Sequence, residues 1–264
     1  MQPTPTAPSQ PDPPTQQAAL ASLVGVLISR LFAGIKPSDA AAALPDIKAQ
    51  VAAIIHRYSQ VSALAATEHY LQAREAAGVA GRFRTTMAEA PPIEQVAKTL
   101  NWATAPLVAP PPDDPIKLAE QQIAAVVATQ QRLTGSASRL VLQTGRETTL
   151  RNVKRDPHAH GWARQVESEN PCAFCALLAT RGAVYKNGSE ASAGFQAHDH
   201  CECQPVPNFG DYELPEKVQE FRDLYYSLPH GGGIKAFRAA FEAKYDPQGR
   251  AAKADDAANT ASPA

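Results

Sequence analysis

One stretch of the sequence has the pattern of a long helix: DPIKLAEQQIAAVVATQQRLTGSASRLVLQTGRETTL, residues 114–150. Asp114 suits the N-cap, and Pro115 suits the first helical position, where a backbone N–H is not needed. The apolar side chains that follow recur at roughly heptad spacing: Ile116, Ile123, Val126, Val127, Leu133 and Leu140. Glycine lowers helix propensity, and two glycines weaken the pattern, Gly135 and Gly145. We predict a long helix over residues 111–155.

Two further helical patterns precede this stretch. The first covers residues 18–34, AALASLVGVLISRLFAG, and has Leu20, Leu23, Val24, Leu27 and Leu31 at helical spacing. It is short for a membrane span and carries Arg30, so we expect a buried amphipathic helix. The second runs from about 46 to 79, with one apolar face made of Ile47, Val51, Ile54, Ile55 and Tyr58. Together they predict a helical N-terminal region over residues 18–110.

Composition agrees with an α-rich protein and limits the possible functions. The chain has 264 residues, and only 6% of them are aromatic. A formal net charge of −1 argues against a generally basic protein that coats nucleic acid. The N-terminus has no positive region followed by an apolar one, so we expect no secretory signal and an intracellular, soluble protein. Residues 1–17 and 247–264 have the composition of a disordered arm and a disordered tail.

Residues 156–210 form a different region, which holds all four cysteines of the chain. GWARQV, AVYK and HCECQPV predict three strands, the last with Cys201 and Cys203 on one face. CAFCALLATRG predicts a short helix that ends at Gly182. Residues 211–246 then predict helices with two apolar faces: Val218, Phe221, Leu224 and Leu228, and Ile234, Phe237, Phe241 and Tyr245. The expected fold is mainly α, with a small α+β C-terminal module organised around a cysteine and histidine cluster.

The cysteine spacing favours a structural zinc site. Cys172 and Cys175 form a two-ligand knuckle. The second pair of ligands comes from a cluster farther along the chain: His198, Cys201 and Cys203, with His200 as an alternative nitrogen ligand. Thiols are usually reduced inside cells, and Zn²⁺ binds sulfur and nitrogen together, so four of these groups are expected to hold one ion. A redox dithiol, local disulfides and buried free thiols remain as alternatives. The other histidines, His158, His160 and His230, are expected in loops or turns, and Trp162 and Tyr185 as core or edge aromatics.

The order of these motifs resembles the MuF-like head morphogenesis family, the minor capsid proteins of tailed bacteriophages. NPCAFCALLATRGAVY and HDHCECQPVPNF are most similar to the minor head proteins of phages of actinobacteria. The resemblance matches Cys172 and Cys175 to the first pair, His198 to the lone histidine, and Cys201 and Cys203 to the closing pair. Many relatives have proline where this chain has Asp199.

The resemblance implies an assembly protein of the virion head. Its expected partners are the portal and the capsid or scaffold proteins, with DNA contacted at most indirectly and no membrane. Its expected location is the host cytoplasm during assembly, and then the head interior or the portal region, where it would act in head assembly, DNA packaging or ejection.

An enzyme is the rival class of protein. Some related phage proteins are regarded as capsid maturation proteases, and a metal with an open position could hydrolyse peptide or phosphodiester bonds. Glu202 or Glu169 would then serve as the base. The sequence has neither an H-E-x-x-H motif nor a G-x-S-x-G elbow, and the many candidate ligands favour a closed structural site, so we predict no catalytic residue. A DNA-contacting module is a further alternative, and it would need a basic face.

Overall fold

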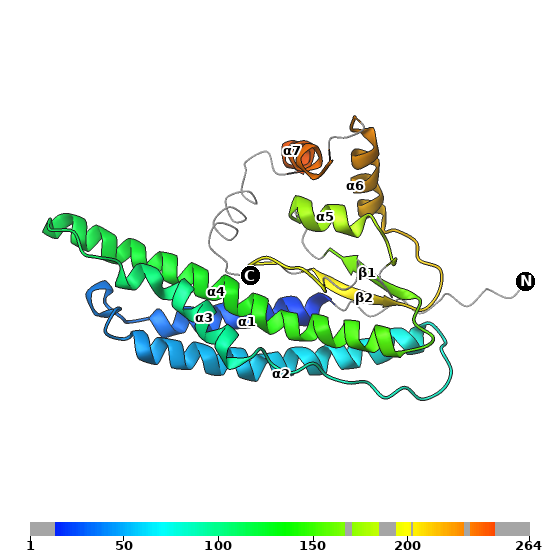
Figure 1. The fold of residues 1–264 in the computed structure, drawn as a ribbon, viewed down its shortest axis with the longest axis horizontal. Coiled ribbons are helices and arrows are strands. Elements are labelled where there is room, and N and C mark those ends of the chain that lie inside the picture. The colour runs from blue at the N-terminus through cyan, green and yellow to red at the C-terminus, as the bar shows by residue number, and fades with distance from the viewer. Residues whose placement is uncertain (1–13, 167–170, 185–193, 202, 230–232, 246–264) are drawn as a thin grey trace, which may run out of the picture.

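The computed structural model describes residues 14–166, 171–184, 194–201, 203–229 and 233–245. Its elements, in chain order, are α1 (Pro14–Phe32), the 3-10 helix η1 (Pro37–Asp39), α2 (Leu44–Ala76), α3 (Ile93–Thr104), the 3-10 helix η2 (Ala105–Val108), α4 (Pro115–Arg155), β1 (Gly161–Gln165), α5 (Ala173–Ala179), β2 (Gln204–Asn208), α6 (Glu216–Ser227) and α7 (Gly233–Tyr245). Helices α1 to α4 form an elongated bundle, and the later elements lie on one side of it (Figure 1). The fold class is therefore the predicted one.

Helix α4 is the centre of the bundle and packs against α1, α2 and α3. Its predicted start is confirmed, because the Asp114 carboxylate accepts the N–H of Ile116 at 2.8 Å and Pro115 is the first helical residue. The helix runs without a break through both glycines to Arg155. Its predicted apolar face is buried only from Leu133 onward, at Leu133 and Leu140. Nearer the N-terminus, three members of that face are 50% exposed or more: Ile116, Ile123 and Val127.

The other two predicted helices are also present, with shifted ends. Helix α1 begins at Pro14, so the last residues of the predicted arm form its first turn. Its buried side chains are Leu20, Val24, Ile28 and Phe32, whereas Leu23, predicted on the same face, is 41% exposed. Helix α2 ends at Ala76, before Gly78 takes a left-handed conformation with φ 67°. The expected face of α2 is confirmed at Ile47, Val51 and Ile55, which pack in the core of the bundle.

The two glycines of α4 have a packing role. A Cβ on Gly145 would lie 2.5 Å from Oγ and 2.9 Å from the carbonyl oxygen of Ser62 in α2. Ser62 and Gln17 of α1 exchange two hydrogen bonds at the same place, Ser62 Oγ to Gln17 Oε1 and Gln17 Nε2 to the Ser62 carbonyl. Gly145 therefore allows α1, α2 and α4 to approach one another at a point where any side chain would collide.

Gly145→Ala is expected to destabilise the bundle by about 1–3 kcal/mol, the usual cost of overpacking a tight contact. Helix propensity alone predicts the opposite sign, a gain of about 1 kcal/mol over glycine. Urea unfolding followed by circular dichroism would measure the difference in the free energy of unfolding. The control is Ala124→Gly at an exposed position of the same helix, which should also destabilise, by about 1 kcal/mol. A more stable Gly145→Ala protein would contradict the packing role.

The C-terminal module contains a two-stranded antiparallel sheet. Strand β1 pairs with β2 in the register Gly161 with Asn208 to Gln165 with Gln204. The first predicted strand is confirmed, and Trp162 in it is buried against Phe195, with ring centroids 5.7 Å apart. The predicted start of the third strand, at His200, is wrong. Strand β2 begins at Gln204, after both cysteines, because a turn at Asp199 and His200, the latter with φ 63°, replaces extended backbone there.

Two smaller predictions in this region also change. Helix α5 ends at Ala179 with Thr180 as its C-cap, earlier than the predicted end at Gly182, which follows with φ 68°. The predicted strand AVYK is absent at Ala183 and Val184, and its other residues lie outside the described part of the chain.

Several other residues and segments of the sequence-based predictions also lie outside the described part of the chain: Tyr185, His230, Glu169, Glu202, residues 1–13 and residues 247–264. His158 and His160 are exposed in the loop between α4 and β1, as predicted.

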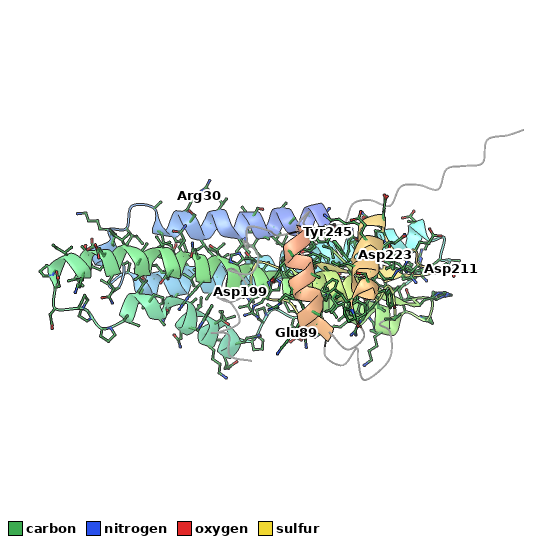
Figure 2. All side chains as sticks on the ribbon, turned by 90° about the horizontal axis from the view of Figure 1, so that it is seen from above. Arg30, Glu89, Asp199, Asp211, Asp223 and Tyr245 are labelled. Atoms are coloured by element: carbon green, nitrogen blue, oxygen red, sulfur yellow. The ribbon has the colours of Figure 1, made fainter. Side chains whose placement is uncertain are left out.

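Helices α6 and α7 pack on α5 through aromatic side chains. Phe221, Phe237 and Phe241 form a buried cluster with Ala173 and Ala176 of α5. Seen from above, the two helices, which carry the labelled Asp223 and Tyr245, lie over one half of the bundle, and the end of α1 near Arg30 extends beyond them (Figure 2). The bundle and the C-terminal module thus meet over only part of the length of α4.

Candidate metal centre

Two segments far apart in the sequence bring the predicted ligands together. Cys172 is the N-cap of α5, and its sulfur accepts the backbone N–H of Cys175 at 3.3 Å. This cap turns both thiols of the C-x-x-C motif to the same side, as in a zinc knuckle. The second segment is the loop before β2, which the structure describes at residues 198–201 and at Cys203. The short helix and the loop together form the site.

The thiols and one imidazole form two overlapping groups, each compact enough to hold an ion. The Cys175 and Cys201 sulfurs are 3.6 Å apart, and Nε2 of His198 lies 2.9 Å from the sulfur of Cys172. The potential ligand atoms fall into two overlapping triples, each with all atoms within 4.8 Å of one another: Cys172, Cys175 and His198, and Cys175, Cys201 and Cys203. Cys175 belongs to both triples and so lies at the centre of the cluster.

Of the two candidate histidines, the structure places His198 with the thiols. The ring of His200 instead lies against α4, where its Nε2 would be 2.6 Å from a Cβ on Gly135. Nδ1 of His198 lies 2.6 Å from the carbonyl oxygen of Asp199. A carbonyl only accepts hydrogen bonds, so Nδ1 carries the proton and the neutral ring has its lone pair on Nε2. That lone pair is directed to the thiols, which is the state that a metal-binding histidine needs.

The thiols are buried and influence one another's protonation. None of the four forms a disulfide, and only Cys172 is partly exposed. The pKa of Cys175 is lowered to about 6; the hydrogen bond with Cys172 acts to raise it, but the contacts with Cys201 and Cys203 outweigh that effect. Hydrogen bonds that the Cys203 thiol donates to Cys175 and Cys201, and then burial, raise the pKa of Cys203 well above its usual value. These thiols share protons that a bound cation would replace. Three or more thiol sulfurs with one imidazole nitrogen are the donors that Zn²⁺ prefers, so the residues fit a metal of this kind.

Helix α4 holds the loop in place at three points. Asp199 forms an ion pair with Arg139, with Nε and Oδ1 2.6 Å apart. His200 packs on Gly135, one turn before Arg139. Arg146 donates from Nε to the Cys203 carbonyl at 3.0 Å and from Nη2 to the Cys201 carbonyl at 2.5 Å. The cluster is therefore fixed to the bundle on one side and to α5 on the other.

The arginines around the cluster could not be predicted from the sequence. Arg139, Arg146 and Arg164 all contact the loop or a thiol, but none stands in a recognisable motif. Arg139 and Arg146 are seven residues apart on α4, a spacing that places them on one face of the helix. In the sequence they are indistinguishable from solvated surface charges. Only the packing of the loop on α4 identifies them.

The chain is thus a mainly α protein with a thiol and imidazole cluster suited to a metal ion. A family model described as VG15 protein matches residues 10–228, which is more than half of the chain. The chain therefore belongs to this family of phage proteins. No curated protein and no solved structure gives a match. No helix in the described residues is long and apolar enough to cross a membrane.

Proposed function

We propose that this chain is a minor head protein that acts in head assembly of a tailed phage and contains a structural zinc ion. The observation that carries the proposal is the convergence of the cysteine and histidine motif into one buried cluster in a chain of a phage protein family. The order of that motif is the feature that resembles the MuF-like minor capsid proteins. The proposed ligands are four of Cys172, Cys175, His198, Cys201 and Cys203.

A structural role for the ion follows from what the cluster connects. Helix α5 carries the two aromatic-rich helices α6 and α7, whereas the 198–203 loop is held by α4. An ion bound by both segments would join the C-terminal helices to the bundle. A tetrahedral zinc ion has four coordination positions, and five candidate groups surround it here. A catalytic zinc needs one position open for water, so the number of ligands favours a structural zinc site over a metal hydrolase.

The proposed partners are the portal and the capsid or scaffold proteins. The exposed apolar side chains on the first half of α4, Ile116, Ile123 and Val127, offer a surface that such a partner could cover. The proposed place of action is the host cytoplasm during assembly, and then the head interior or the portal region, with a role in DNA packaging or ejection.

Two measurements test the proposal. Protein purified under reducing conditions is expected to contain about one zinc ion per chain by elemental analysis, since the cluster offers one set of four ligands. Tagged wild-type protein should copurify with the portal or scaffold of the same phage and be present in purified heads, whereas Cys203→Ser should be absent from them. A metal content near zero, with four reduced thiols, would refute the proposed zinc site. Absence of the wild-type protein from heads and from portal complexes would refute the proposed assembly role.

The same particles separate the assembly role from a protease. Glu202→Gln and Glu169→Gln should give particles in which the major capsid subunit has its wild-type size, because a closed site has no proton transfer for a carboxylate to perform. If wild-type particles contain processed capsid subunits and either variant enters particles but leaves them unprocessed, the chain is a protease.

A further inference from the structure

Two arginines lie buried beside the thiol cluster. Arg146 of α4 has no exposed surface, and Arg164 of β1 is 2% exposed. A buried arginine normally has an anionic partner, because an unpaired buried charge is strongly destabilising. Arg74, the other buried arginine of the described residues, follows this rule, since it pairs with Asp156. Within the same part of the chain, neither Arg146 nor Arg164 has a carboxylate within ion-pair distance.

Their actual contacts leave the two charges uncompensated. Arg146 donates to two backbone carbonyls, those of Cys201 and Cys203, and its Nη1 has no hydrogen-bond partner in the structure. Arg164 donates to the Gln196 carbonyl at 2.9 Å and to the sulfur of Cys175 at 3.5 Å. Carbonyl dipoles solvate a guanidinium but carry no net charge.

Both guanidinium groups also lie against the same aromatic ring. The Cζ atoms of Arg146 and Arg164 are 5.1 and 3.7 Å from the ring centroid of Phe195. Cation–π contacts of this kind stabilise each cation by about 2 kcal/mol or more when desolvated. They do not remove the repulsion between two buried cations that share a ring, which needs an anion nearby.

The groups able to provide that anion are the thiols. The Cys175 sulfur accepts a hydrogen bond from Arg164. The backbone carbonyls of Cys201 and Cys203 accept hydrogen bonds from Arg146, so these two thiols also lie close to it. A divalent ion bound by three thiolates and one imidazole has a net charge of −1, and one bound by four thiolates has −2. Either centre would compensate the buried positive charge more completely than the thiols do without an ion.

We propose that Arg146 and Arg164 are the counter-charges of a metal–thiolate centre and that they set the affinity of this centre for its ion. The inference rests on the zinc site of the proposed function. The two arginines are positioning residues: they contact the ligands and not the ion. Arg146 also links the centre to α4, because the guanidinium that compensates the thiolates is part of the longest helix of the bundle.

Competition with a chromophoric chelator on the full-length, reduced protein tests this inference. Arg146→Met and Arg164→Met should each weaken zinc binding roughly ten- to a hundred-fold, the usual effect of removing a group that supports metal ligands. Arg164→Lys should restore much of the loss, because it keeps the charge. The matched control is Arg74→Met, which removes a buried arginine whose partner is Asp156; it should lower stability without changing zinc affinity.

Spectra of the Co²⁺-loaded proteins distinguish loss of charge from loss of a ligand. The sulfur-to-cobalt charge-transfer bands of the variants should match those of the wild type, since no ligand is changed. Wild-type affinity, within about twofold, in either methionine variant would overturn the inference, and Arg164→Met alone decides it if Arg146→Met does not fold. No zinc binding by the wild type would instead refute the zinc site itself.

Discussion

Cys175→Ser is expected to release the C-terminal helices while leaving α1 to α4 folded. Cys175 belongs to both ligand triples, so its loss removes the one group that the two triples share. Helices α6 and α7 pack on the same short helix that carries this cysteine. A structural zinc ion contributes on the order of 10 kcal/mol to the folding of small domains that depend on it, and a module of this size has little apolar core to replace it.

Limited proteolysis of the full-length protein measures this release. In Cys175→Ser, and in the wild type treated with a chelator, the first cuts should fall between β1 and α7, and a fragment that contains α1 to α4 should persist. The control is Thr180→Ser at the C-cap of the same helix, which keeps the hydroxyl that donates to the Leu177 carbonyl. Equal protection of the variant and the wild type would show that the cluster does not hold the module in place.

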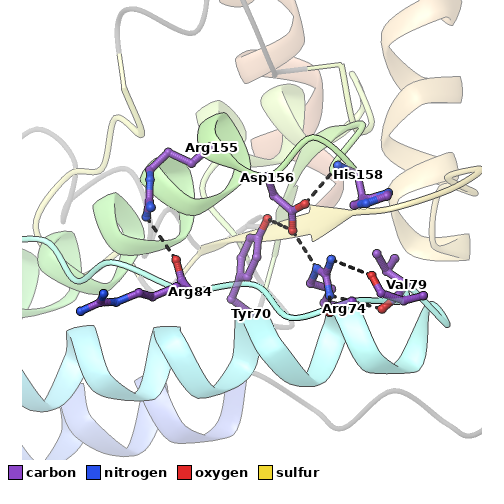
Figure 3. Close-up of polar contacts among 9 residues, drawn as sticks. Tyr70, Arg74, Val79, Arg84, Arg155, Asp156 and His158 are labelled. Carbon is purple, nitrogen blue, oxygen red and sulfur yellow. Dashed lines mark hydrogen bonds and ion pairs between the residues drawn. The ribbon is translucent and has the colours of Figure 1, made fainter.

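Asp156→Ala is expected to cost about 3–5 kcal/mol of the free energy of unfolding, because it leaves the charge of Arg74 buried without a partner. The Asp156 carboxylate accepts from Arg74 Nε at 3.0 Å and from the Tyr70 hydroxyl at 3.3 Å (Figure 3). Burial, and then the charge of Asp156, raise the pKa of Tyr70, so the phenol stays protonated as a donor. Arg74 also donates to the carbonyls of Val79, Ala80 and Gly81.

Urea unfolding of the variants would measure this cost. Glu242→Ala, which removes the partly exposed partner of Arg238 on α7, is the control and should change stability by less than about 1 kcal/mol. The double variant Arg74→Met with Asp156→Leu should recover much of the loss, since an apolar pair of similar size avoids the desolvation of both charges. An effect of Asp156→Ala no larger than that of Glu242→Ala would mean that the buried ion pair does not join the ends of α2 and α4.

The sequence by itself determined the helices, because their signals are local. Apolar spacing predicted α1, α2 and α4, and Asp114 with Pro115 marked the start of α4 to the residue. The C-x-x-C and H-x-x-C-x-C motifs identified the groups that could form a cluster, since ligand spacing is a property of a short piece of chain. Strand β1 was also predicted, from GWARQV.

The tertiary structure decided which of these groups face one another. The apolar pattern of α4 is continuous, yet Ile116, Ile123 and Val127 are exposed because the neighbouring segments pack on another side of these turns, where Ala125 is buried. The turn at residues 199–200 directs His198 to the thiols and His200 to Gly135 of α4. The buried Arg146 and Arg164 have no local signal, because burial and charge compensation depend on neighbours that are distant in sequence. Periodicity and spacing act over a few residues, whereas these contacts join residues as far apart in the chain as Gly135 and His200.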